Sequence, residues 1–202
     1  MIAVIDYGAG NLHSVVNALD FIGAKSIVTA DREVILNADK VILPGVGAFG
    51  DAMDNINNAG LVPVIKEVVN NNTPFLGICL GLQLLFEKSC ESVGKTGLSI
   101  FRGSIQSIPK TPGLKIPHMG WNSIEYNKDS RLFHGIGEEP FVYFVHSYYM
   151  VPEDESIISA YTEYGARLGI AVEKDNVFAT QFHPEKSGEC GLKILKNFAE
   201  EV

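Results

Sequence analysis

The stretch PFLGICLGLQLLF, from Pro74 to Phe86, holds one cysteine between two apolar runs. Cys79 follows Gly77 by two residues and precedes Gly81 by two residues. The first run has the length and composition of a buried strand, and the second has helical spacing. A chain that turns abruptly from strand to helix strains its turn residue and needs small neighbours on both sides. We therefore predict a strand, a tight turn at Cys79, and a helix.

The rest of the first half places this unit in a parallel sheet. Further apolar strand candidates cover residues 2–5, 25–29 and 40–45, and the strand before the cysteine covers 74–78. Helical patterns cover residues 11–23, 48–60, 61–72 and 80–89. Buried strands that alternate with helices are typical of a parallel sheet covered on both faces.

After about Glu91 short strand candidates with turn residues replace the helices. They cover residues 97–108, 122–126, 141–150, 156–165 and 169–182, with a hairpin turn at 173–176 and a last helix at 191–202. We expect one α/β domain over residues 1–202. Its central sheet should be mostly parallel, with helices on both faces and a β-rich second half.

Composition limits the function classes. The formal net charge of -8 disfavours nucleic acid or an anionic membrane as the main partner. No apolar run approaches the roughly 20 residues that span a bilayer, and the first ten residues resemble a strand rather than a signal peptide. Three cysteines without CxxC spacing predict neither a disulfide framework nor a zinc site. We expect a cytoplasmic protein with reduced thiols, no metal and no cofactor.

The predicted turn at Cys79 gives this residue the position of the serine in a G-x-S-x-G nucleophile elbow. An elbow raises the sulfur at the carboxyl edge of the sheet and places it at a helix N-terminus, which favours the thiolate. The alternative is that Cys79 is a small buried apolar residue whose glycines only permit close packing. Cys90 and Cys190 lack such a context, and we interpret both as structural or incidental.

A base for this thiol is predicted in the segment FATQFHPEKSG. Pro184 favours an extended backbone at His183, and residues two apart in an extended chain point to the same side. Glu185 can therefore orient one ring nitrogen of His183 while the other faces the thiol. We predict a triad of Cys79, His183 and Glu185, the alternative being a strand end with a solvated glutamate.

Donors for an oxyanion are expected at two places. One is the backbone N–H of Leu80, and the other is Val46 or Gly47 in the loop LPGVGAFG. The spacing Gly45-x-Gly47-x-x-Gly50 matches a dinucleotide fingerprint, but it follows the third strand instead of the first. We interpret it as an oxyanion loop in which glycines let a peptide change orientation.

Taken together, PGVG, GICLGLQLLFE and HPEKS resemble the class I glutamine amidotransferases, whose glutaminases use a Cys-His-Glu triad. The resemblance covers essentially the whole chain, in the expected order, and implies a flavodoxin-like α/β fold. It implies that Cys79 attacks the side-chain amide of glutamine to form a thioester. His183 would then protonate the departing ammonia and activate water.

The resemblance also implies a set of substrate contacts. Gln83 and Glu91 would meet polar groups of glutamine, backbone groups of Ser147 and Tyr148 would meet its carboxylate, and Gly45 would border the same site. Gln83 follows Cys79 by one helical turn, which points it to the same cleft, although an exposed helix position is the alternative.

Three further motifs, DYGAGN, PHMGWN and YFVHSYY, resemble one branch of the family. In that branch the glutaminase serves a separate (β/α)8-barrel cyclase subunit in histidine biosynthesis. The resemblance implies a partner face with Asn11, His118, Met119 and Trp121. The alternative for PHMGWN is ordinary core, and His146 is either a satisfied strand histidine or a neighbour of the cleft.

Other functions remain open from the residues alone. The chain could serve another synthase, such as pyridoxal phosphate synthase, or act as a cysteine hydrolase with the same elbow. It could also be a binding module with an inactive elbow.

Overall fold

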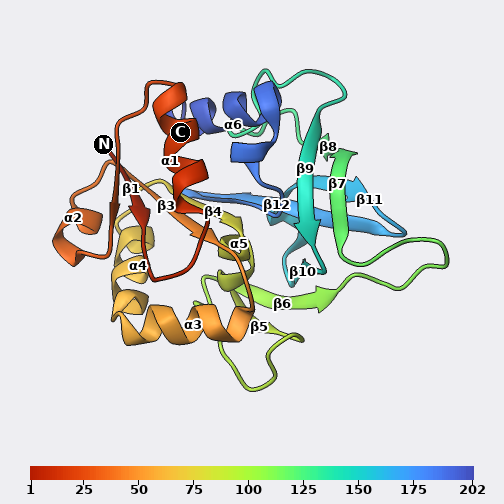
Figure 1. Ribbon diagram of the computed structural model, residues 1–202, viewed down its shortest axis with the longest axis horizontal. Helices are drawn as coiled ribbons and strands as arrows, with labels where there is room; N and C mark the ends of the chain where they lie inside the picture. Colours follow the sequence, from red (N-terminus) through yellow and green to blue (C-terminus); the bar gives the residue numbers. More distant parts are fainter.

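The computed structural model describes residues 1–202, and an eight-stranded sheet runs through its centre (Figure 1). The strand order is β2-β1-β3-β4-β13-β12-β11-β8. The bounds are β1 Ile2–Ile5, β2 Ser26–Thr29, β3 Lys40–Gly45, β4 Phe75–Cys79, β8 Glu125–Tyr126, β11 Ile158–Glu163, β12 Arg167–Lys174 and β13 Val177–Thr180. From β2 to β13 the neighbours pair in parallel, and β12, β11 and β8 continue antiparallel. The mostly parallel sheet is confirmed.

Helices cover both faces of this sheet, as expected (Figure 1). Buried residues of α2 to α5 join one core cluster and those of α1 and α6 join the other, because successive strand residues point to opposite faces. The bounds are α1 Leu12–Phe21, α2 Arg32–Leu36, α3 Phe49–Asn58, α4 Leu61–Asn70, α5 Leu80–Leu84 and α6 Gly188–Glu200, with 3-10 turns η1 Glu155–Ile157 and η2 Pro184–Lys186.

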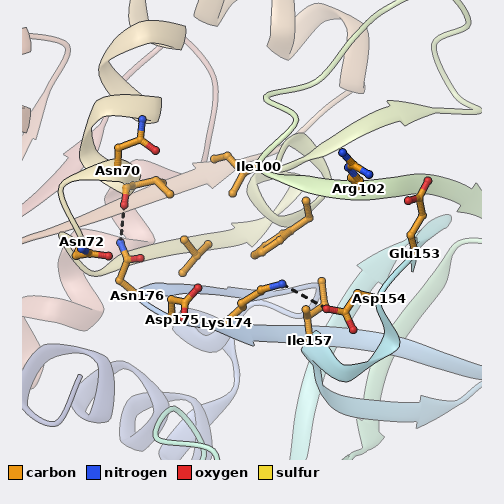
Figure 2. Close-up of a pocket in the computed structure, with 13 residues that line it drawn as sticks. Asn70, Asn72, Ile100, Arg102, Glu153, Asp154, Ile157, Lys174, Asp175 and Asn176 are labelled. Carbon is orange, nitrogen blue, oxygen red and sulfur yellow. Dashed lines mark hydrogen bonds and ion pairs between the residues drawn. The ribbon is translucent and has the colours of Figure 1, made fainter.

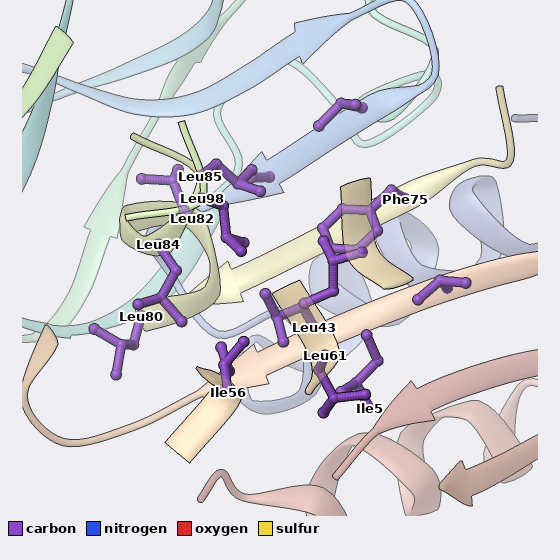
Figure 3. Close-up of a cluster of buried hydrophobic side chains, with 14 of the residues drawn as sticks. Ile5, Leu43, Ile56, Leu61, Phe75, Leu80, Leu82, Leu84, Leu85 and Leu98 are labelled. Carbon is purple, nitrogen blue, oxygen red and sulfur yellow. The ribbon is translucent and has the colours of Figure 1, made fainter. Parts of the chain in front are cut away.

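The core cluster that includes the predicted elbow helix contains seven buried leucines among its 29 residues (Figure 3). Leu80, Leu82 and Leu84 of α5 are buried in the same cluster as Leu43 of β3 and Phe75 of β4. Fully burying one such side chain stabilises the fold by about 1.5–3 kcal/mol. The short helix is therefore fixed against the sheet by packing rather than by its own length.

The second half adds two small sheets. One has the order β10-β6-β5 and the other pairs β7 with β9. Their bounds are β5 Phe86–Ser89, β6 Phe101–Ser107, β7 His118–Ser123, β9 Phe141–His146 and β10 Tyr148–Pro152. The β-rich second half is confirmed, and β12 and β13 form the predicted hairpin, with Lys174 paired to Val177.

Several predicted elements differ in extent. The helix expected over residues 80–89 ends after its first turns, and residues 86–89 form β5 because Phe86 pairs with Phe101 of β6. The strand expected over 141–150 divides at Ser147 between two sheets, and the strand expected over 122–126 divides at Ile124.

Helix α2 was not predicted from the sequence. It has only five residues, too few for a clear helical period. Its N-terminus is capped by Asp31, whose carboxylate accepts hydrogen bonds from the backbone N–H groups of Glu33 and Val34. The cap explains why so short a helix forms at this point.

None of the helices has both the length and the apolar character that crossing a membrane requires. The three cysteines form no disulfide, and no cluster of three or more His, Cys, Asp or Glu side chains is arranged to hold a metal ion.

Candidate active site

Cys79 occupies a sharp turn between β4 and α5. Its backbone has φ +56° and ψ −107°, a conformation that side-chain-bearing residues rarely adopt. A Cβ on Gly77 would lie 2.9 Å from the carbonyl carbon of Gly81, and a Cβ on Gly81 would lie 1.9 Å from the carbonyl oxygen of Leu43. Both positions therefore require glycine, and the predicted strand–turn–helix geometry is present.

The sheet register brings the other predicted groups to the same edge. Gly45 pairs with Cys79, and Thr180 pairs with Ile78, so β3, β4 and β13 end side by side. A pocket of about 300 Å³ opens there, at the lower end of the range for small-molecule sites, about 300–1,000 Å³. Its lining residues are Val46, Gly47, Cys79, Leu80, Gln83, Glu91, Pro117, Val145, His146, Ser147, Tyr148 and His183.

His183 and Glu185 form a buried ion pair behind this pocket. Nδ1 of His183 lies 2.7 Å from Oε1 of Glu185, and their side chains are 3% and 1% exposed. Because a carboxylate only accepts hydrogen bonds, Nδ1 carries the proton. Glu185 does not line the pocket itself, so its contact with the site runs through His183.

The second ring nitrogen of His183, Nε2, is buried and forms no hydrogen bond in this geometry. Burial by itself lowers the pKa of His183, but interactions with the Cys79 sulfur and the Glu185 carboxylate outweigh it and raise the pKa to about 9. A histidine in this environment is cationic at neutral pH, and its charge lies beside the Cys79 sulfur.

The loop after β3 forms another wall of the pocket. Val46 is 40% exposed, and Gly47 has φ +94° with open space where a Cβ would stand. Gly45 does not line the pocket, contrary to its predicted place at the substrate. A Cβ there would lie 2.8 Å from both the Leu80 Cβ and the Tyr7 hydroxyl, so this glycine is required by packing under the elbow.

Gln83 and Glu91 contribute polar side chains to the pocket. One carboxylate oxygen of Glu91, Oε2, accepts a hydrogen bond of 2.8 Å from the backbone N–H of Phe49, at the start of α3. Burial raises the pKa of Tyr148, and the charge of Glu91 adds to the effect. Glu91 is thus an anchored negative charge near the pocket, suited to an ammonium group.

Two buried histidines connect β7 with the segment at Ser147 and Tyr148. Nδ1 of His146 lies 2.8 Å from the Tyr148 carbonyl oxygen, and Nε2 of His146 lies 3.0 Å from Nδ1 of His118. Burial lowers the pKa of both rings to about 4, so both are neutral at pH 7. The carbonyl must accept, which makes His146 Nδ1 and then His118 Nδ1 the donors.

His118 therefore differs from its predicted place on the partner face. It is 3% exposed and is stacked against Phe144 and Tyr164. Met119 and Trp121 point to the opposite side of β7 and are 62% and 56% exposed. Alternation along the strand explains the difference.

Asn11 lies at the start of α1, on the same edge of the molecule as the pocket. It is half-buried and forms no side-chain cap on the helix. With Val46, His183 and Glu185 it lines a narrow crevice behind the elbow. Asn11 is thus close to the loop after β3.

Two side chains beside the elbow were missed in the sequence. Gln181 is completely buried, and its Nε2 donates a hydrogen bond of 3.7 Å to the Cys79 sulfur. Gln181 precedes His183 by two residues, so the same extended-chain argument that identified Glu185 could have identified it. The Tyr7 hydroxyl is buried without a partner, and burial and the nearby Cys79 charge raise the pKa of Tyr7.

A larger cavity, of about 710 Å³, lies elsewhere, where β4 and β13 begin (Figure 2). Three of its polar side chains have partners. Lys174 pairs with Asp154 at 3.3 Å, and the Asn176 amide donates to the carbonyls of Val69 and Thr73. It holds no cysteine, histidine or buried acid–base pair, so the chemistry belongs to the smaller pocket at Cys79.

Comparisons with known proteins show the family of the chain. The family model described as "Glutamine amidotransferase class-I" matches residues 3–202, so the chain belongs to the class I glutamine amidotransferases. It is 51% identical to the imidazole glycerol phosphate synthase subunit HisH of Caldanaerobacter subterraneus over 100% of this chain and 98% of the relative. The HisH proteins of Aquifex aeolicus and Methanocaldococcus jannaschii are 53% and 50% identical, over 96% and 99% of this chain and 94% and 99% of theirs.

Solved structures support the fold. A glutamine amidotransferase crystal structure is matched with a TM-score of 0.76 at 17% identity, over 98% of this chain and 99% of that one. The structure of PurLQS from Thermotoga maritima gives a TM-score of 0.72 at 21% identity, over 98% and 96% of the two chains. The expected glutamine amidotransferase fold is confirmed.

Proposed function

We propose that this chain is the glutaminase subunit of an imidazole glycerol phosphate synthase. It hydrolyses glutamine to glutamate and ammonia and passes the ammonia to a separate (β/α)8-barrel cyclase subunit in the cytoplasm. The observation that carries the proposal is that Cys79 and His183 line one pocket and that the Glu185 carboxylate bonds to His183 behind it. The relatives named HisH, about half identical over the full length, support the choice of synthase.

The proposed reaction uses the Cys79 thiolate as nucleophile, His183 as acid and base, and backbone N–H groups as oxyanion donors. The Cys79 thiolate attacks the side-chain amide carbon of glutamine, and the N–H groups of Leu80 and of Val46 or Gly47 stabilise the oxyanion. His183 transfers its Nε2 proton to the departing ammonia, which leaves a glutamyl thioester. The neutral ring of His183 then takes a proton from water, and the hydroxide releases glutamate from Cys79.

The pocket walls hold the amino-acid end of the substrate. Glu91 pairs with the ammonium group, Gln83 meets a polar group, and backbone groups of Ser147 and Tyr148 meet the carboxylate. This division suits the anchored negative charge of Glu91. It needs no metal and no cofactor, because the thiolate, the imidazole and the backbone donors supply each step.

Ammonia needs an acceptor on another polypeptide, because free ammonia in neutral water becomes non-nucleophilic ammonium. The exposed apolar side chains of Met119 and Trp121 on β7, together with Phe141 on β9, offer a docking face. We place the cyclase subunit on this face. Asn11, on the same edge, belongs to the same proposed interface.

The test is glutamate release measured with and without the cyclase subunit of the same organism and its nucleotide ligand. We expect a slow isolated chain and a fast complex, since loss of one oxyanion donor costs about 10²- to 10³-fold in rate. Gly47 has φ +94° and no neighbour within 4 Å of its Cβ position, which supports a peptide that can reorient there. Fast turnover without the partner would contradict the switch. No glutamate release in the complex would contradict the glutaminase itself.

A further inference from the structure

Gln181 lies between β13 and His183 and has no solvent exposure. Its Nε2 donates to the Cys79 sulfur at 3.7 Å, and its Oε1 accepts from Nε2 of Gln83 at 3.1 Å. Its backbone N–H donates to the Ile170 carbonyl at 2.7 Å, which fixes the chain at this point. One buried amide thus joins the sulfur to a wall of the pocket.

We propose that Gln181 is a positioning residue that donates a permanent hydrogen bond to the Cys79 sulfur and holds Gln83 in place. The proposal rests on the proposed function only in taking Cys79 as the nucleophile. Nothing in the triad itself requires a buried amide at this position.

A carboxamide is chemically suited to both neighbours. Its N–H is a donor at every pH, and a donor stabilises a thiolate more than a thiol. Burial would otherwise penalise a sulfur anion. Its carbonyl oxygen satisfies the N–H of Gln83 at the same time. A leucine of similar size offers neither group, and a glutamate offers only acceptors when ionised.

Gln181 lies behind the pocket and not among its lining residues. It therefore contacts the nucleophile without contacting the substrate directly. Losing the amide should lower kcat more than it raises KM, because the thiolate changes while most substrate contacts remain.

The charged and titratable groups around the sulfur come from three directions. They are His183 after β13 with its partner Glu185, Tyr7 after β1 and Glu91 after β5. His146 at the end of β9 and Tyr148 at the start of β10 line the same pocket. All of them remain in the variants below. A change in the pH response of Cys79 can then be assigned to the amide.

The experiment measures alkylation of Cys79 by iodoacetamide in the full-length chain across pH, followed by mass spectrometry of the Cys79 peptide. Gln181→Leu removes the donor, and Gln181→Glu replaces it with a negative charge. We expect the pH of half-maximal alkylation to rise by about one unit in Gln181→Leu, because a hydrogen bond to a charged group is worth about tenfold or more. Gln181→Glu should raise it further.

Asn197→Leu is the matched control. Asn197 is also fully buried and uses its amide to donate to two carbonyls, those of Leu132 and His134, within another part of the core. The Asn197→Leu variant should be less stable than the wild type but should show the same dependence of Cys79 alkylation on pH. If Gln181→Leu and Gln181→Glu lose stability but keep the wild-type midpoint, the amide is only structural and the proposal is overturned.

The alkylation needs neither glutamine nor the cyclase. It therefore reports on Gln181 even if the wild-type complex releases no glutamate, an outcome that would contradict the proposed function alone. In an active complex, the wild type and Gln181→Leu should differ at least about tenfold in kcat and less in KM. An unchanged kcat would count against the proposal.

Discussion

The backbone of Leu43 leaves no room for a side chain at Gly81, since a Cβ there would lie 1.9 Å from the Leu43 carbonyl oxygen. This contact ties α5 to β3 and thereby sets how far the elbow rises from the sheet. Because the Leu43 carbonyl oxygen and the Gly81 Cα both belong to the backbone, neither can move away without shifting β3 or α5.

The first prediction is that Gly81→Ala severely destabilises the protein. Overpacking of this kind costs about 1–3 kcal/mol and more when backbone must shift. Urea unfolding measures the effect. Gly137→Ala is the comparison variant, because nothing lies within 4 Å of the Gly137 Cβ position. Any loss of stability there comes from the positive φ of Gly137, which Gly81 does not share, and not from a steric clash. Equal stabilities of the two variants would show that the elbow tolerates a methyl group.

The elbow was predictable because the two glycines and the apolar runs are close in sequence. His183 and Glu185 were predictable for the same reason, since residues two apart in an extended chain share a side. Their distance from Cys79 along the chain did not matter once all were assigned to strand ends at one edge of a parallel sheet.

Part of what escaped prediction depends on partners that are distant in sequence, and part on alternation along a single strand. Residues 86–89 have a helical pattern but become β5 through pairing with β6. Sheet pairing overrides local preference in such cases. His118 was assigned to the surface along with Met119 and Trp121, although alternation on a strand separates it from them.

The second prediction concerns Cys79→Ala in the complex with the cyclase. Glutamate formation should fall below detection, because no other group can form the thioester. Synthesis driven by added ammonium salts should continue, because the cyclase site lies on the other subunit. Both rates are measured on one preparation. If ammonium-driven synthesis also stops, delivery of ammonia to the partner is wrong.

The third prediction is an alkaline limit on activity. His183 has its pKa raised to about 9 and must be protonated to release ammonia, so kcat/KM of the complex should fall as pH rises above about 9. Glu185→Gln removes one of the groups that raise the pKa, and the fall should begin about one pH unit lower or more. Glu189→Gln, an exposed acid on α6, is the control and should leave the profile unchanged.

The fourth prediction concerns stability in acid. His118 and His146 have their pKa lowered to about 4 by burial, whereas an unfolded histidine titrates near 6.5. The unfolded chain then binds more protons, so stability is full above pH 6.5 and falls as pH decreases toward 4. The slope is about 1.4 kcal/mol per pH unit for each ring. His183 has the opposite shift, so its contribution to stability is full below pH 6.5 and is lost as pH rises through about 9.

Urea unfolding at several pH values between 4 and 7 measures this slope. His146→Gln should reduce this slope by the contribution of one ring, about 1.4 kcal/mol per pH unit. His13→Gln changes an exposed histidine and should leave the slope unchanged. A slope that is the same in all three proteins would mean that the buried rings do not control the acid response.

The fifth prediction tests the docking face. Trp121 is 56% exposed and contacts Tyr143 edge to face at 6.1 Å, so its ring is held in place while most of its surface remains free. Preorganised aromatic side chains are common binding hot spots, and truncation of one costs about 2 kcal/mol or more. Trp121→Ala should weaken cyclase binding at least about 30-fold by calorimetry.

Val93→Ala, which removes a 93% exposed apolar residue elsewhere, should bind like the wild type. Equal affinities for Trp121→Ala and wild type would place the partner on another face, because a rigid, exposed indole cannot be buried at an interface without contributing to it.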